Sequence, residues 1–219
     1  MQRVNLKKYK ILFLSILFFS SGYITNILLE SDKLVLNSIA EQLSANQIEK
    51  FLKIQEKWQL ASFLLLPVIF YIKASIISSI LYVGVFFFSK TKVNFKQLLN
   101  VSIKAEFIFL GVGILKLIWF YFFQTNYTLE DLQYFYPLSA LNIIGYNGLE
   151  TYFIYPFQVL NLFELAYILL LGYYVGKLVY TPQNKENSID FGLKIVASSY
   201  VPALFLWVTV VMFFTLNYS

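Results

Sequence analysis

The stretch from residue 61 to residue 88 reads ASFLLLPVIFYIKASIISSILYVGVFFF, and Lys73 is its one charged residue. A helix that crosses a bilayer needs about 20 mostly apolar residues, so this stretch predicts a transmembrane helix. Working outward along the chain, similar apolar stretches occur at residues 11–29, 105–123, 157–180 and 195–216. The sequence therefore predicts an all-α fold, an integral membrane bundle of five transmembrane helices.

The composition agrees with one membrane domain over residues 1–219, because hydrophobic residues make up 58% of the chain and charged residues only 13%. His and Cys are absent, which removes the commonest zinc, haem and iron–sulfur ligands and all thiol nucleophiles. The chain also lacks a phosphate-binding P-loop, a dinucleotide fingerprint and a Gly-x-Ser-x-Gly elbow. We therefore expect no cofactor, no metal site, no catalytic residue and no enzymatic activity.

The basic residues lie at the ends of the predicted helices rather than on one stripe, so the net charge of +5 indicates contact with anionic lipid and not with nucleic acid. With a cytoplasmic N-terminus, the inner segments carry Arg3, Lys7, Lys8, Lys10, Lys90, Lys92, Lys96, Lys104, Lys177, Lys185 and Lys194. The outer connections carry Lys33, Lys50, Lys53 and Lys57 beside Glu30, Asp32, Glu41, Glu49, Glu56, Glu130, Asp131 and Glu150. This bias follows the positive-inside rule and, with five spans, places the C-terminus outside. Lysine-rich, arginine-poor usage indicates an AT-rich bacterial genome, so we expect the bacterial inner membrane.

A second interpretation exists for the first span. Basic residues, an apolar run and the small residues Ser20, Ser21 and Gly22 are also typical of a cleavable secretory signal. The apolar character continues through residues 24–29, which a signal does not require. Cleavage would leave four spans with the same orientation.

Residues 31–59 form an outer segment with apolar residues at spacings near three and four, which predicts one or two amphipathic helices. Such a helix either lies on the outer leaflet or docks a partner. No strong helix breaker separates Phe51 from Phe63, so the helix is also able to continue into the second span and project beyond the membrane before Pro67 kinks it.

The outer loop, residues 124–156, contains two Tyr-Pro pairs, Tyr136-Pro137 and Tyr155-Pro156. Proline suits the first turn of a helix, so two helices are predicted to begin there. The first, residues 137–144, is too short to cross and stops before Gly145, so we expect an interfacial or re-entrant helix. The second helix is expected to open the fourth span.

Four charged residues lie inside apolar runs: Lys73, Glu106, Lys116 and Glu164. Each costs at least ~2.5 kcal/mol near the middle of a bilayer unless it is neutralised. Similar depth predicts a Lys116–Glu164 pair, with Lys73 within reach of Glu164 and with Glu106 hydrated near the inner surface. The pair is either an ion pair that holds helix register or part of a proton or ion pathway.

Gly172 and Gly176 form a GxxxG motif in the fourth span. The motif lets helices approach closely, either inside one chain or in a dimer, so the oligomeric state stays open.

The fourth span carries Leu160-Asn161-Leu162-Phe163-Glu164-Leu165, then an apolar helix with Gly172 and a lysine-bearing link, and Asn94-Phe95-Lys96-Gln97-Leu98-Leu99 precedes the third span. These segments resemble the Yip1-domain family, particularly its small bacterial members. The tryptophan that often follows the Phe is absent, and Ala166 and Tyr167 stand there. The resemblance implies a multi-pass membrane protein whose eukaryotic relatives are linked to vesicle trafficking and GTPase partners.

These observations favour a non-enzymatic membrane scaffold or assembly subunit, in contact with the lipid bilayer and with other membrane proteins. The alternative is a small transporter or channel that uses the intramembrane Lys and Glu residues.

Overall fold

The computed structural model describes residues 2–40, 43–180 and 187–218. Within these ranges the chain forms helices and no strand, apart from one isolated bridge between Ser139 and Asn161. Five helical stretches are long and apolar enough to cross a membrane: Tyr9–Leu28, Ala61–Phe88, Phe95–Phe123, Leu162–Val179 and Ser188–Tyr218. The predicted all-α bundle with five spans is confirmed. Lys185, one of the basic residues expected inside, lies outside the described ranges.

The helices belong to two compact units, one of residues up to Tyr71 with Leu110–Phe135, the other of Ile72–Phe109 with residues from Tyr136 onward. Two of the three boundaries between them along the chain fall inside spans, and the third, between Phe135 and Tyr136, falls between the third and fourth spans. One boundary lies four residues after Pro67, inside the long second-span helix. The other lies directly after the 3₁₀ segment Glu106–Phe109 of the third span.

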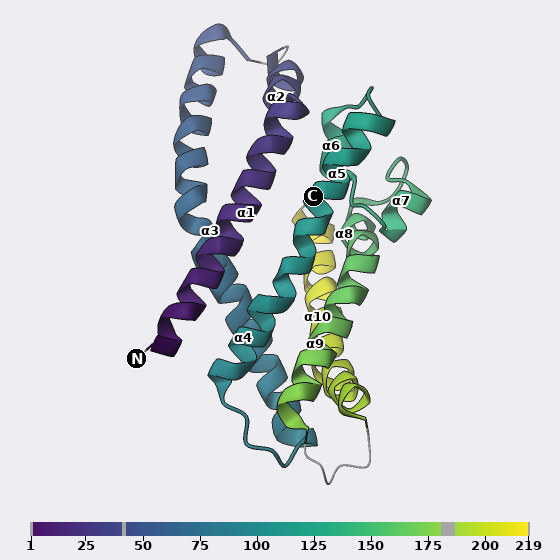
Figure 1. Cartoon of the computed structure of the whole chain (residues 1–219). Helices are drawn as coiled ribbons and strands as arrows, with labels where there is room; N and C mark the ends of the chain where they lie inside the picture. Colours follow the sequence, from purple (N-terminus) through teal and green to yellow (C-terminus); the bar gives the residue numbers. More distant parts are fainter. Residues whose placement is uncertain (1, 41–42, 181–186, 219) are drawn as a thin grey trace. The chain divides into compact units, whose positions relative to one another are not determined.

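The first unit contains α1 (Gln2–Leu28), α2 (Ser31–Ala40), the first part of α3 (Ala45–Phe88), α5 (Leu110–Ile118), the π-helical turn Trp119–Phe123 and α6 (Leu129–Tyr134). In Figure 1, α1 (purple) connects through α2 to the blue α3. The rings of Phe19 and Phe63 meet at 4.9 Å and join α1 to α3. Leu29, Phe120 and Leu132 form a small buried core beneath the ends of the helices.

Helix α3 runs without interruption through Pro67, so the outer amphipathic residues of its first part are continuous with the second span. The sequence left continuity with the second span open as one possibility, and the structure shows it. Asp32 of α2 holds this part in place, since its carboxylate accepts hydrogen bonds of 2.7 Å from the side-chain amides of both Asn26 in α1 and Gln55 in α3.

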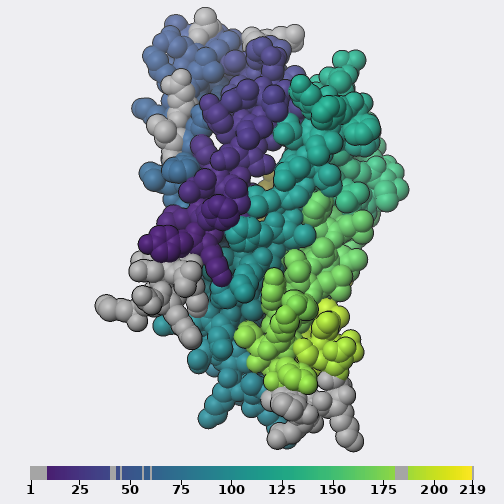
Figure 2. All heavy atoms as spheres, viewed as in Figure 1, coloured from purple at the N-terminus to yellow at the C-terminus, as the bar shows by residue number. Residues whose placement is uncertain are grey.

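The second unit contains the rest of α3, α4 (Phe95–Ala105), the 3₁₀ segment, α7 (Ala140–Ile144), α8 (Thr151–Val159), α9 (Leu162–Val179) and α10 (Ser188–Tyr218). Helices α9 and α10 pack side by side along most of α9, and Figure 2 shows the pale green α9 against the yellow-green start of α10. Their contact is close because Gly172, Gly176 and Gly192 meet there. A Cβ added at Gly176 or Gly192 would collide with the backbone of the facing helix, and one added at Gly172 would collide with the Leu193 side chain. The GxxxG residues thus pack within this chain.

The fourth span differs from its prediction. The sequence predicts one helix over residues 157–180 that opens at Pro156, but Pro156 lies inside α8 and the chain breaks at Leu160 and Asn161 before α9 begins. The physical reason is a helix start at Asn161, whose side chain accepts a hydrogen bond of 2.7 Å from the Glu164 N–H. The predicted short outer helix is present as α7, and Gly145 ends it with a φ of 83°.

Candidate functional site

Glu106 is the centre of a polar cluster inside the second unit. Its side chain is almost fully buried, and one carboxylate oxygen lies 2.9 Å from the Lys73 ammonium. The other accepts a hydrogen bond of 3.0 Å from the Tyr167 hydroxyl. The Lys73 ammonium also lies 4.6 Å from the centre of the Phe109 ring, a cation–π distance. The carboxylate is therefore neutralised and hydrogen-bonded at the same time, which a buried charge requires.

The hydrated position expected for Glu106 is wrong. The helical stretch of the third span begins at Phe95, so Glu106 lies about 17 Å along it at 1.5 Å per residue. Helix α4 starts early because Asn94 and Gln97 form a reciprocal capping box. The neighbouring Lys104 has a different contact, since its ammonium lies 5.3 Å from the centre of the Tyr174 ring.

Glu164 has a tyrosine partner of its own. The Tyr200 hydroxyl of α10 donates a hydrogen bond of 2.7 Å to the Glu164 carboxylate. The Tyr200 ring meets the Tyr167 ring edge-on, with 5.6 Å between the centroids. Two tyrosine–glutamate pairs, from α9, α10 and the 3₁₀ segment, thus lie next to each other around one lysine. We call Lys73, Glu106, Glu164, Tyr167 and Tyr200 the carboxylate cluster.

The charges of the carboxylate cluster do not balance. It contains one ammonium and two carboxyl groups, and the apolar residues Leu171 and Ile195, both fully buried, belong to the same core. A hydrocarbon environment penalises an uncompensated charge by several kcal/mol. Glu164 is therefore the carboxyl group of the cluster that a tyrosine hydroxyl contacts, whereas the lysine pairs with Glu106.

The break before α9 positions Glu164. The Ala140 N–H donates a hydrogen bond of 2.8 Å to the Leu160 carbonyl, and the Leu162 N–H donates one of 3.1 Å to the Leu138 carbonyl. These bonds join the start of α7 to the chain between α8 and α9, and they stabilise the non-helical conformation there. Leu138 has a φ of 58°, an uncommon conformation for a non-glycine residue. Glu164 consequently lies in the first turn of α9, where the positive end of the helix dipole favours a carboxylate.

Tyr136 precedes this segment and lies outside the spans. Burial, followed by the negative charge of the nearby Glu164 carboxylate, raises the pKa of Tyr136 to about 12. The side chain therefore stays protonated through the physiological range.

The two lysines predicted to lie near Glu164 contact other groups in the structure. Lys73 pairs with Glu106 and not with Glu164. Lys116 belongs to the first unit, where its ammonium donates to the Leu132 carbonyl of α6. A Lys116–Glu164 pair would join the two units and stays a prediction.

Tyr167 and Tyr200 belong to the cluster but were not among the predicted site residues. The signal was present, because each tyrosine lies inside an apolar span, away from the interfacial belt where tyrosine is common. Asn161-x-x-Glu164 is likewise a helix-start signature that argues against one continuous fourth helix.

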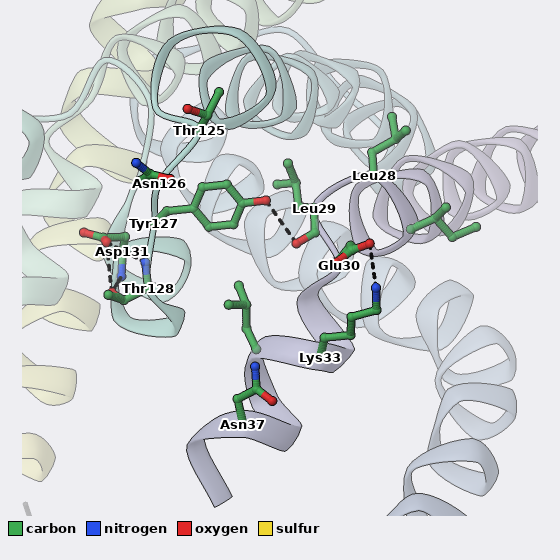
Figure 3. A pocket seen from close by; sticks show the side chains of 12 residues that line it. Leu28, Leu29, Glu30, Lys33, Asn37, Thr125, Asn126, Tyr127, Thr128 and Asp131 are labelled. Carbon is green, nitrogen blue, oxygen red and sulfur yellow. Dashed lines mark hydrogen bonds and ion pairs between the residues drawn. The ribbon is translucent and has the colours of Figure 1, made fainter. Parts of the chain in front are cut away.

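The first unit contains an open pocket of about 770 Å³, drawn in Figure 3. Its walls are the end of α1, the start of α2 and the loop that leads into α6. It is lined by Ile27, Leu28, Leu29, Glu30, Lys33, Leu34, Asn37, Thr125, Asn126, Tyr127, Thr128 and Asp131.

No group of three or more His, Cys, Asp or Glu able to hold a metal ion occurs in the part of the chain that the structure describes. Comparison of the chain with protein-family models, with curated proteins and with solved structures returns no significant match.

Proposed function

We propose that this chain is a non-enzymatic multi-pass protein of the bacterial inner membrane that acts as a scaffold or partner subunit, in the manner of the Yip1-domain proteins it resembles. The observation that carries the proposal is the continuity of α3. The lack of His and Cys in the sequence adds support, because the commonest catalytic and metal-binding side chains are missing.

The first part of α3, residues 45–60, precedes the membrane-spanning stretch Ala61–Phe88. At 1.5 Å per residue this part measures about 24 Å. A helix that rests on a leaflet has to bend sharply where the chain enters the hydrocarbon. Helix α3 stays helical there, and its proline, Pro67, lies six residues further on, inside the spanning stretch. Its continuity therefore favours a helix that projects from the membrane and docks a partner.

The projecting part carries an exposed apolar pair. Ile54 and Trp58 lie one helical turn apart on the same face, and their side chains are 55% and 63% exposed. A tryptophan beside an aliphatic residue is a common anchor in protein interfaces. We infer that Ile54 and Trp58 contact an apolar groove of a partner membrane protein.

Trp58 itself provides the test. In a chain with Trp119→Phe and Trp207→Phe, Trp58 is the one remaining tryptophan. Its fluorescence should not be quenched by lipids brominated near the headgroup, and a photo-crosslinker at position 58 should capture one companion in native membranes. Ile54→Gln should abolish that crosslink, while the control Glu49→Gln, on the opposite face of α3, should keep it. Quenching by the brominated lipid without a discrete crosslink would refute the scaffold and favour a helix that lies on the leaflet.

We propose a cytoplasmic N-terminus, on the strength of the lysine distribution alone. A cysteine in place of Ser44 should then react with an impermeant maleimide in intact cells, and a cysteine in place of Lys92 should react only after lysis. The reverse pattern would invert the orientation.

A second candidate function is proton- or cation-coupled transport, which the carboxylate cluster favours. Two carboxyl groups share one lysine next to a helix break, and broken helices are typical of binding sites in transporters. Purified protein in liposomes with a trapped pH dye should then move protons down a pH gradient. Glu164→Gln should abolish the flux without loss of folded protein, and equal flux in wild type and in empty liposomes would refute transport.

A further inference from the structure

The pocket of the first unit lies at the ends of two membrane spans. One wall consists of the end of the span Tyr9–Leu28 and the residues after it, and the other follows the span Phe95–Phe123. The first and third spans cross the membrane in the same direction, because a single span separates them in the chain. Both walls therefore emerge on the same membrane face, whichever face that is, and the pocket lies at the level of the lipid headgroups.

The pocket has an apolar side and a polar side. Ile27 and Leu28, in the last turn of α1, are both more than 40% exposed and belong to the membrane-spanning stretch or its edge. Opposite them, the loop contributes the hydroxyl and amide groups of Thr125 and Asn126. This arrangement matches a molecule that is apolar at one end and polar at the other.

The charges of the pocket are mixed. The Lys33 ammonium lies 2.7 Å from the Glu30 carboxylate, and Asp131 adds a second carboxylate to the wall. Figure 3 shows Glu30 and Lys33 together on one side and Asp131 on the other. The Lys33 and Glu30 side chains are 68% and 60% exposed, so their pair contributes little free energy and exchanges readily for other partners.

The backbone around the pocket is held in place. Glu30 has a φ of 47°, in the left-handed region that non-glycine residues rarely occupy, and this conformation ends α1. The Tyr127 hydroxyl donates a hydrogen bond of 3.1 Å to the Leu29 carbonyl and connects the loop to the end of α1. The pocket is thus formed before any ligand binds.

We propose that this pocket binds the headgroup of phosphatidylethanolamine, a zwitterionic phospholipid with a primary ammonium. The ammonium donates hydrogen bonds to the Glu30 carboxylate in the negative field of Asp131, and the phosphate accepts from Lys33. The acyl chains follow Ile27 and Leu28 into the membrane. Phosphatidylcholine cannot donate from its quaternary ammonium, and phosphatidylglycerol brings a net negative charge to a pocket that already has more carboxylates than ammonium groups.

Thermal unfolding of the full chain in dodecyl maltoside micelles tests this assignment. Each of the three lipids, with identical acyl chains, is added at increasing concentration, and glycerophosphoethanolamine serves as the soluble headgroup. Phosphatidylethanolamine should raise the Tm at the lowest concentration, with at least about fivefold higher apparent affinity than the other two lipids, which corresponds to about 1 kcal/mol. The soluble headgroup should have no effect at the same concentration.

The variant Glu30→Gln/Lys33→Gln should remove the preference for phosphatidylethanolamine. A matched control is available in Glu49→Gln/Lys53→Gln, since that pair has the same 2.7 Å distance and side chains that are 66% and 69% exposed. The control should keep the full preference. If the pocket variant does not unfold cooperatively, Lys33→Gln alone, measured by native mass spectrometry of bound lipid, should show the loss. Equal stabilisation by all three lipids, an equal effect of the soluble headgroup, or a preference that survives in the pocket variants would each overturn the proposal.

Discussion

The pairing of Lys73 with Glu106 makes a quantitative prediction about stability. The Glu106 side chain is 2% exposed and the Lys73 side chain is 46% exposed, so Lys73 has room to move toward water or headgroups when its partner is lost. Removal of one partner of a buried ion pair costs about 3–5 kcal/mol. We expect Glu106→Gln to cost about 3 kcal/mol, at the lower end, because the glutamine amide oxygen still accepts from Tyr167 and Lys73 is free to reorient.

Lys73→Met should cost about 4 kcal/mol, since it leaves a buried carboxylate without its cation and Glu106 cannot reach water. The double variant Lys73→Met/Glu106→Gln should cost clearly less than the sum of the two, by at least about 2 kcal/mol, because neither charge then remains unpaired. The free energies come from reversible unfolding in mixed micelles of dodecyl maltoside and dodecyl sulfate, followed by circular dichroism.

The exposed pair Glu49–Lys53 is the control, and each of its neutral variants should change the free energy of unfolding by no more than about 0.5 kcal/mol. Additive costs in the Lys73 and Glu106 cycle, within about 0.5 kcal/mol, would show that the two side chains do not interact. Such a result would refute the structural account of the cluster.

Three further predictions concern one glycine and two tyrosines of the second unit. Gly176→Ala should destabilise the protein by about 1–3 kcal/mol, because its Cβ would collide with a carbonyl of α10, whereas the control Gly22→Ala, with open space around the added atom, should be tolerated in the same unfolding assay. Tyr200→Phe should cost about 1.5–3 kcal/mol through the lost hydrogen bond to the Glu164 carboxyl group, and an unchanged unfolding midpoint would contradict that bond. The raised pKa of Tyr136, about 12 against 10.0 for an ordinary tyrosine, means that the unfolded chain ionises first, so stability should fall as pH rises from 10 to 12. Tyr136→Phe should reduce that fall, and identical pH profiles for the two proteins would exclude Tyr136 as its source.

The site was only partly predictable from the sequence. Lys73, Glu106 and Glu164 stand out because charged residues are rare in apolar spans, and the structure brings all three into one region of the second unit. Their partners did not follow from depth alone. Lys73 contacts Glu106 because the second span packs near the 3₁₀ segment, and helix periodicity contains no information about which spans are neighbours.

The sequence by itself determined that the chain has five helices long and apolar enough to cross a membrane. Residues 61–88 are predicted as a span, and the structure places them in one unbroken helix, Ala45–Phe88, because the ability to cross hydrocarbon depends on local length and apolarity, and backbone groups are satisfied within the helix. Tertiary structure decided the break before Asn161 and the partners of the two buried glutamates. Both depend on contacts between residues far apart in the chain, such as the bonds from residues 138–140 to residues 160–162, and the free energy of such contacts exists only once the helices are packed.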